Sequence, residues 1–106
     1  MDDMTKLKLP RKQIEQFCTK WGVIELSLFG SVLRDDFRPD SDVDVLVTFS
    51  PKTRWTLFDH VDMQDELKTI FQREVDLVTR HGIERSQNEI RRQDILESAE
   101  VIYVQS

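Results

Sequence analysis

Apolar residues between Pro10 and Gly22 recur three or four positions apart, which is the spacing of one helix face. The side chains on this face are Ile14, Phe17, Cys18 and Trp21. Proline is typical of the first turn of a helix, and glycine commonly ends one. The pattern therefore predicts a helix that stops at Gly22 and buries these four side chains.

Two further helices are predicted later in the chain. Residues 55–71 carry an apolar face formed by Leu57, Val61, Leu67 and Phe71, with Met63 and Ile70 at its edge. Ser86 and Glu89 match a capping box, which places a last helix over residues 90–99. A short apolar stretch, "VIYV", follows that helix.

Strands are predicted where apolar and polar residues alternate. The stretch "VIELSLF" alternates over residues 23–29 and ends at Gly30 and Ser31. In "DVDVLVTF", over residues 42–49, the face formed by Val43, Val45, Val47 and Phe49 is apolar, and "REVDLVT" predicts a third strand over residues 73–79. A short helical turn is expected over residues 31–35. The order of elements predicts an α/β (α+β) fold, a small mixed sheet covered by helices on one face.

Composition narrows the class of protein. A chain of 106 residues is the size of one domain, so residues 1–106 are expected to form a single domain. The net charge of −5 argues against a protein that binds nucleic acid through its overall field. The lone cysteine, Cys18, excludes an internal disulfide and is expected to be a buried packing residue. With no apolar stretch long enough for a signal peptide or a membrane span, a cytoplasmic location is expected.

The stretch "GSVLRDDFRPDSDVDVLV" holds five aspartates within residues 35–44. Asp42 and Asp44 are two apart in a predicted strand, so they share the face opposite the valines. Two adjacent carboxylates repel each other unless a cation lies between them. Mg²⁺ is held by one or two carboxylates together with phosphate oxygens, so the pair also implies a nucleotide.

Other residues extend this candidate site. Gly30 lets the backbone approach a phosphate closely, and Ser31 offers a hydroxyl and an N–H group. Asp76 lies between Val75 and Leu77 and is expected to bring a third carboxylate to the same face, as a site for two metal ions requires. Arg34 is a weaker candidate for phosphate contact. Asp40 is two positions before Asp42 and would share its face if the strand extended that far. It follows Pro39, however, which favours a turn.

This combination resembles the Gly-Ser, ten residues, Asp-x-Asp signature of the DNA polymerase β-like nucleotidyltransferase superfamily. "EVDLVT" resembles the superfamily's third-carboxylate strand, and the resemblance covers roughly residues 10–103. The small size and the style of the motif are most similar to the minimal nucleotidyltransferase (MNT) antitoxins of the MntA type, which are paired with HEPN toxins. The motif departs from the family where Asp35 and Asp36 follow Arg34 in place of a glycine.

The resemblance implies both a site and a function. It implies that Gly30 and Ser31 contact the triphosphate of ATP, that Asp42 and Asp44 bind two Mg²⁺ ions, and that Asp76 completes the site. It further implies that the protein transfers AMP from ATP to a tyrosine of a cognate HEPN ribonuclease toxin and so silences it. The expected partner is this toxin, with which it forms a hetero-oligomer, and neither a membrane nor direct contact with nucleic acid is expected.

Two alternatives stay open. One is an antitoxin that acts by binding alone and keeps a vestigial site, although the intact Gly-Ser pair and three aspartates argue against it. The other is a nucleotidyltransferase for a small molecule or RNA, although such enzymes usually need a further domain to hold the acceptor. His60 and His81 are interpreted as surface or packing residues. The cluster of Arg85, Arg91 and Arg92 is either a solvated face or a contact for phosphate or toxin.

Overall fold

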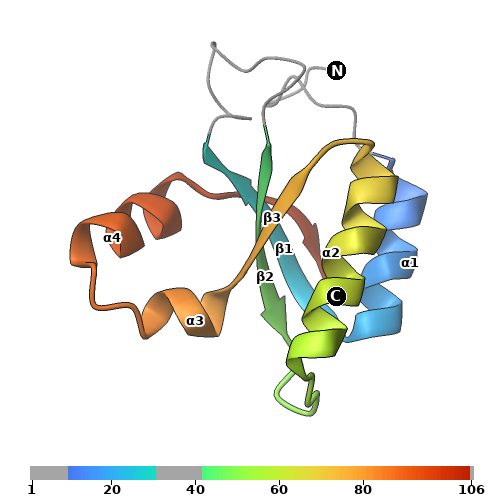
Figure 1. The fold of residues 1–106 in the computed structure, drawn as a ribbon, viewed down its shortest axis with the longest axis horizontal. Coiled ribbons are helices and arrows are strands. Elements are labelled where there is room, and N and C mark those ends of the chain that lie inside the picture. Colours follow the sequence, from blue (N-terminus) through green and yellow to red (C-terminus); the bar gives the residue numbers. More distant parts are fainter. Residues whose placement is uncertain (1–9, 31–41, 106) are drawn as a thin grey trace.

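The computed structural model describes residues 10–30 and 42–105, which form a four-stranded sheet flanked by helices. In chain order the elements are α1 (Arg11–Trp21), β1 (Val23–Phe29), β2 (Val43–Phe49), α2 (Leu57–Phe71), β3 (Val75–Thr79), α3 (Arg80–Glu84), α4 (Glu89–Ser98) and β4 (Glu100–Val104). The strand order is β3-β2-β1-β4 (Figure 1). Because β2 is parallel to β3 while β1 is antiparallel to β2 and β4, the sheet is mixed, which confirms the predicted fold class.

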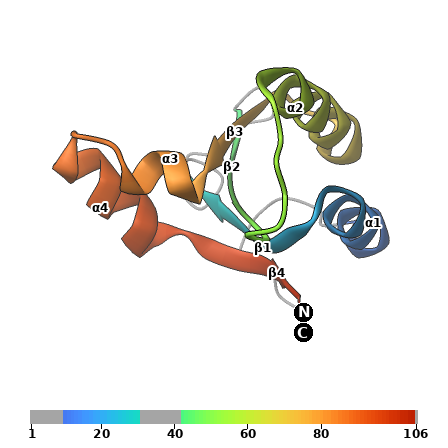
Figure 2. The ribbon, with the colours of Figure 1, turned by 90° about the horizontal axis from the view of Figure 1, so that it is seen from below.

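The main core lies between the sheet and the helices α1 and α2 (Figure 2). Alternation along β2 sends Val43, Val45 and Val47 into this core, where each is fully buried. The four side chains predicted for the first helix are also buried, and Gly22 ends that helix in the left-handed conformation, as predicted. Burial raises the pKa of the Cys18 thiol to about 12, so this cysteine stays protonated and serves as a packing residue.

The apolar face predicted for the second helix is partly wrong. Leu67 and Phe71 are buried, and Met63, which was placed at the edge, is only 1% exposed. Leu57 and Val61, by contrast, are 78% and 52% exposed. Residues four apart lie on the same side of a helix. Met63, Leu67 and Phe71 therefore form the buried side of α2, whereas Leu57 and Val61 lie on another side that faces solvent.

The second face of the sheet also carries helices, which corrects the expectation that helices cover one face alone. Phe29 of β1 and Leu46 of β2 pack there against Ile83 of α3 and Ile95 of α4. Figure 2 shows α3 and α4 on the side of the sheet opposite α1 and α2. The short helix α3 was not predicted from the sequence, and the apolar segment that forms β4 was not assigned to a strand.

The cap of the last helix differs from the prediction as well. Asn88, not Ser86, is the N-cap, and its Oδ1 accepts a hydrogen bond from the Arg91 N–H at 3.1 Å. Ser86 instead accepts a hydrogen bond from the Asn88 N–H. The helical turn predicted over residues 31–35 lies outside the described residues. Across residues 10–30 and 42–105, no helix has both the length and the hydropathy needed to cross a membrane.

Gly22 provides a test of this packing. Its φ is +69°, and a Cβ at this position would lie 2.5 Å from Cγ2 of Thr53. Gly22→Ala is expected to lower the free energy of unfolding by at least about 1–2 kcal/mol, the cost of a left-handed conformation for a residue with a Cβ. Urea denaturation measures this loss.

The Thr53→Ser background removes the obstructing methyl group and serves as the control. Gly22→Ala should cost less in that background than in the wild-type chain, because only the backbone strain remains. An equal cost in both backgrounds would contradict the predicted contact between Gly22 and Thr53.

Candidate functional site

Asp44 and Asp76 occupy directly paired positions on the parallel strands β2 and β3. Paired residues on neighbouring strands point to the same side of a sheet, and the strands are about 4.8 Å apart. Asp44 is half-buried and Asp76 is exposed, whereas Val45 and Leu77, the next residue of each strand, are buried in the core on the other face. The structure therefore places these two carboxylates side by side on the face away from α1 and α2.

Asp42 lies at the same end of the sheet, one residue before β2 begins. Its side chain is exposed, and the strand starts with Val43, whose N–H donates to the carbonyl of Glu74 at 2.9 Å. This bond fixes the start of β2 against the segment that enters β3. Asp42 is therefore two residues before Asp44. It lies just outside β2, although the sequence predicted that it belongs to this strand.

Gly30 lies directly against the carboxylate of Asp44. It follows β1 with a φ of +80°, and a Cβ at this position would be 2.2 Å from Oδ2 of Asp44. The antiparallel pairing of Phe29 with Asp44 brings the two segments together. A side chain at position 30 would therefore collide with Asp44. This close approach explains why position 30 requires glycine, and it could not be inferred from the sequence.

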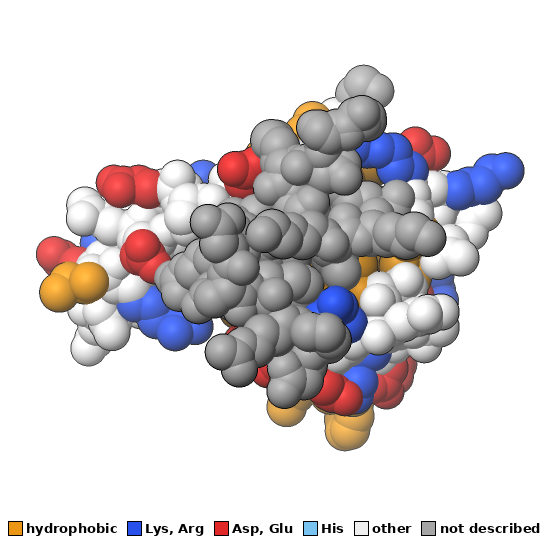
Figure 3. Space-filling view, turned by 90° about the horizontal axis from the view of Figure 1, so that it is seen from above, with side chains coloured by type: hydrophobic (Ala, Val, Ile, Leu, Met, Phe, Trp, Pro, Cys, Tyr) orange, Lys and Arg blue, Asp and Glu red, His pale blue; other side chains and the backbone are white. Residues whose placement is uncertain are grey.

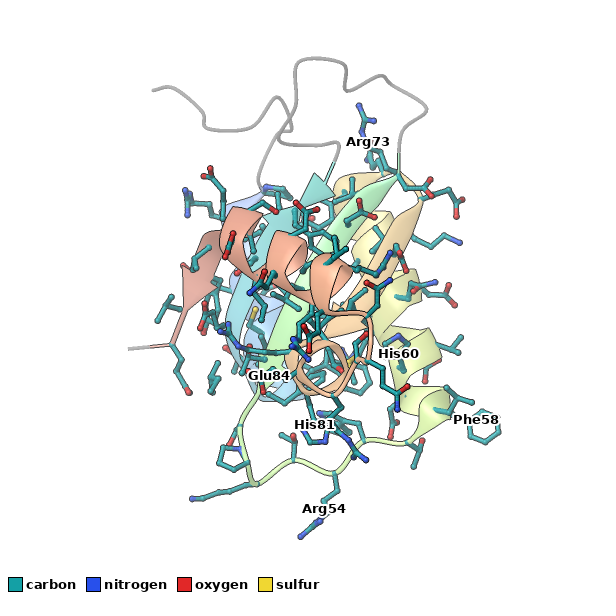
Figure 4. All side chains as sticks on the ribbon, turned by 90° about the vertical axis from the view of Figure 1, so that its left-hand side faces the viewer. Arg54, Phe58, His60, Arg73, His81 and Glu84 are labelled. Atoms are coloured by element: carbon teal, nitrogen blue, oxygen red, sulfur yellow. The ribbon has the colours of Figure 1, made fainter. Side chains whose placement is uncertain are left out.

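Three residues considered from the sequence lie outside the described residues: Ser31, Arg34 and Asp40. Seen from above, the described residues present both acidic and basic side chains on this side of the molecule (Figure 3). One of the basic residues at this end is Arg73, in the turn before β3 (Figure 4). It was not considered as a candidate from the sequence, in which it directly precedes the "EVDLVT" strand.

Helix α2 holds the backbone of β3 next to Asp76. Because β3 is at the edge of the sheet, half of its backbone groups have no neighbouring strand. Gln64 Oε1 accepts a hydrogen bond from the Leu77 N–H at 3.2 Å, and His60 Nε2 donates to the Leu77 carbonyl at 3.1 Å. These two side chains are one helical turn apart. They supply the hydrogen bonds that a neighbouring strand would otherwise make to Leu77, the residue after Asp76.

The arginine cluster has mainly local contacts. Arg92 donates to the carbonyl of Ser86 at 3.0 Å, and a guanidinium nitrogen of Arg85 lies 3.5 Å from Nε2 of His81. Each contact joins a residue of the connection over residues 85–88 to an adjoining helix: Arg85 contacts His81 of α3, and Arg92 of α4 contacts Ser86. A role of Arg85, Arg91 and Arg92 in binding phosphate or a partner stays a prediction.

The donors at the aspartate end fit a hard divalent cation, because all three are carboxylates and Mg²⁺ prefers oxygen ligands. Two like charges on paired positions repel each other, and a cation between them would relieve that repulsion. In the described part of the chain, no three Asp, Glu, His or Cys side chains are already close enough to form a metal site. Mg²⁺ can be coordinated by one or two protein carboxylates together with phosphate oxygens. The three aspartates therefore fit an ion that binds together with a nucleotide.

Comparison with known proteins connects this arrangement to a family. The family described as "Nucleotidyltransferase domain" matches residues 10–102. A Methanocaldococcus jannaschii protein provisionally named protein adenylyltransferase MJ0435 is 34% identical over 73 residues, which are 69% of this chain and 76% of the relative.

Three solved structures are similar in fold. A toxin–antitoxin crystal structure with AMP-PNP has a TM-score of 0.68 and 16% identity, covering 92% of this chain and 76% of the other. A tri-AMPylated Shewanella oneidensis HEPN toxin in complex with an MNT antitoxin gives a TM-score of 0.59 and 18% identity, covering 88% of this chain and 68% of the other. A structure provisionally named as a minimal nucleotidyltransferase, 31% identical with a TM-score of 0.64 over 85% of this chain and 86% of the other, shares the same fold, as the resemblance in sequence implied.

The contact of α2 with β3 predicts a specific effect of Gln64→Met. The substitution removes the acceptor of the Leu77 N–H and should cost about 0.5–1.5 kcal/mol, the net contribution of a hydrogen bond that is only partly buried. Hydrogen exchange at the Leu77 amide should accelerate along with this loss of stability. Gln64→Glu, which keeps an acceptor at the same place, is the matched control and should retain the protection. Equal protection of the amide in Gln64→Met would contradict the proposed contact.

Proposed function

Because this chain belongs to the nucleotidyltransferase domain family, we propose that it transfers AMP from ATP to a tyrosine of a cognate HEPN toxin and thereby acts as its antitoxin. The observation that carries the proposal is the pairing of Asp44 with Asp76 beside Gly30. The naming of one relative as a protein adenylyltransferase supports the reaction, and the AMPylated toxin in a similar complex supports the partner.

In this proposal Asp42 and Asp44 would hold the Mg²⁺ that accompanies the triphosphate, and Asp76, on the acceptor side, would act as the base or as a ligand of a second ion that acidifies the acceptor hydroxyl. The ions would also neutralise the charge of the phosphates. Gly30 would let the backbone approach the triphosphate, and Ser31 and Arg34 are the proposed phosphate contacts that follow it in the sequence. The half-buried position of Asp44 in β2 suits a ligand whose orientation is fixed by the sheet.

The proposed reaction is an in-line displacement at phosphorus. The tyrosine oxygen forms a bond to the α-phosphorus of ATP, the bond from that phosphorus to the bridging oxygen breaks, and pyrophosphate leaves. The hydroxyl proton must pass to a base. Asp76 is suited to this task because it is exposed and belongs to an edge strand, so that an acceptor can reach it from outside the sheet.

Two substitutions separate the roles of the carboxylates. Asp76→Asn is nearly isosteric, and it should slow AMP transfer by about 10²- to 10⁴-fold, the usual contribution of a positioned base, while Mg·ATP affinity stays near that of the wild type. Asp44→Asn should lose both affinity and transfer. Intact mass of the toxin after incubation with ATP and Mg²⁺ measures transfer, and calorimetry measures affinity. Asp62→Asn, an exposed aspartate on α2, is the matched control and should change neither.

Each contrary result has a distinct meaning. A toxin that is bound and silenced without a gain in mass would replace transfer with an antitoxin that acts by binding alone. Label that accumulates on a small molecule or RNA, while the toxin stays unmodified, would assign a different acceptor. A loss of Mg·ATP affinity in Asp76→Asn as large as the loss of transfer would make Asp76 a nucleotide ligand rather than the base.

A further inference from the structure

A cavity of about 680 Å³ lies at the end of β2 and β3 opposite the aspartates. Its walls come from the ends of these two strands, from residues 50–56, from the start of α2 and from α3. The buried side chains of Val47 and Met63 contribute to its lining. Figure 4 shows Arg54, His60 and His81 toward this end of the molecule and Arg73 at the other.

The charged side chains that line the cavity are Arg54, Arg80 and Glu84, two cations against one carboxylate, although the chain as a whole carries a net charge of −5. The imidazoles of His60 and His81 add polar groups to the lining. Glu84 already pairs with Arg80, whose Nε lies 3.1 Å from Oε2. Arg54 is exposed and has no hydrogen bond or ion pair with any described residue. The cavity therefore presents uncompensated positive charge at its edge.

Large apolar side chains are exposed next to this charge. Within seven residues, Trp55, Leu57, Phe58 and Val61 are 39%, 78%, 83% and 52% exposed. Phe58 projects away from the body of the molecule (Figure 4). The other large apolar side chains exposed in the described part of the chain are on α4 and β4: Ile90, Val101 and Val104. No comparable group of neighbours within the described residues contains both an exposed tryptophan and an exposed phenylalanine.

The segment that carries these side chains is held in place before any partner binds. The indole Nε1 of Trp55 donates to the Trp21 carbonyl at 2.9 Å, and the two tryptophan rings meet edge-to-face with their centroids 5.1 Å apart. Thr53 bonds to the carbonyl of Ser50 through its N–H at 3.0 Å and its hydroxyl at 2.8 Å. A preformed surface of this kind loses little conformational entropy on binding.

We propose that Arg54, Trp55, Leu57, Phe58 and His81, together called the basic-aromatic face, form the docking surface for the toxin and bind an acidic segment that carries an apolar side chain. This inference rests on the proposed function, which supplies the partner. A small anion in the cavity would leave Leu57 and Phe58 in water, whereas a protein covers them together with the cationic edge. Aromatic residues and arginine are also the side chains that contribute most at protein interfaces.

The distance between the two ends suits a single partner. From Val43 to Phe49 the strand β2 advances six residues, or about 20 Å. A globular domain of about 100 residues has a radius of gyration of about 13 Å, so its diameter exceeds this span. A toxin of at least this size can therefore bind the basic-aromatic face with one segment and present its acceptor tyrosine to the aspartates with another.

Two exposed positions test the proposal with little risk to folding. Phe58→Ser and Arg54→Glu should each raise the dissociation constant of the toxin by about 10- to 100-fold, the effect of removing a major interface contact. Calorimetry without nucleotide measures this constant on the full chain and the full-length toxin. Ile90→Ser is the matched control, since Ile90 is also 83% exposed but lies on α4, and it should bind the toxin as the wild type does. Mg·ATP affinity should be unchanged in all three variants.

The outcomes separate this inference from the proposed function. Wild-type toxin affinity in both Phe58→Ser and Arg54→Glu would overturn the docking surface, even if AMP transfer is normal. A loss of Mg·ATP affinity in Arg54→Glu would assign the cavity to a nucleotide and also overturn it. If both variants lose the toxin while the wild-type complex gains no AMP, the docking surface is supported and the transfer reaction is wrong. No binding by the wild type would overturn both.

Discussion

The pairing register of β2 is the constraint on which the candidate site depends. On one side it sets Asp44 opposite Asp76, and on the other it sets Asp44 opposite Phe29, so that Gly30 meets the Asp44 carboxylate. The same register sends the valines of β2 into the core. A shift by one residue would exchange the two faces, burying carboxylates and exposing valines. Burial of the valines therefore fixes the position of the carboxylates.

Forces outside the carboxylates hold these like charges together. The repulsion between Asp44 and Asp76 is opposed by the buried face of β2 and β3 and by the hydrogen bonds of His60 and Gln64 to Leu77. Such a site would be preorganised for the proposed metal and nucleotide, because the sheet positions its carboxylates in advance. The opposite end of the same strands carries positive charge and exposed aromatic rings, so the two ends are suited to different ligands.

The sequence predicted what depends on local periodicity and missed what depends on contacts between distant segments. Alternation over residues 42–49 correctly indicated that Val43, Val45 and Val47 are buried, but it missed Leu46, which is buried on the opposite face. Helical spacing identified the buried side chains of α1. The face of α2 was partly wrong because exposed Leu57 and Val61 resemble core residues when only hydrophobicity is considered. Periodicity could not reveal contacts between residues that are far apart in the sequence. Three such contacts are the packing of Leu46 against Ile83 and Ile95, the close approach of Gly30 to Asp44, and the hydrogen bonds to Leu77.

The central claim is that this register builds one site for metal and nucleotide at the paired aspartates. Anomalous scattering from crystals grown with Mn²⁺ and a non-hydrolysable ATP analogue tests it most directly, since it locates the ion independently of activity. The account predicts an ion bound by the carboxylate of Asp44, on the face that Asp76 shares, and in contact with the phosphates of the analogue. An analogue bound with its ion away from Asp44 and Asp76, for example in the cavity beside Arg54, would contradict the account.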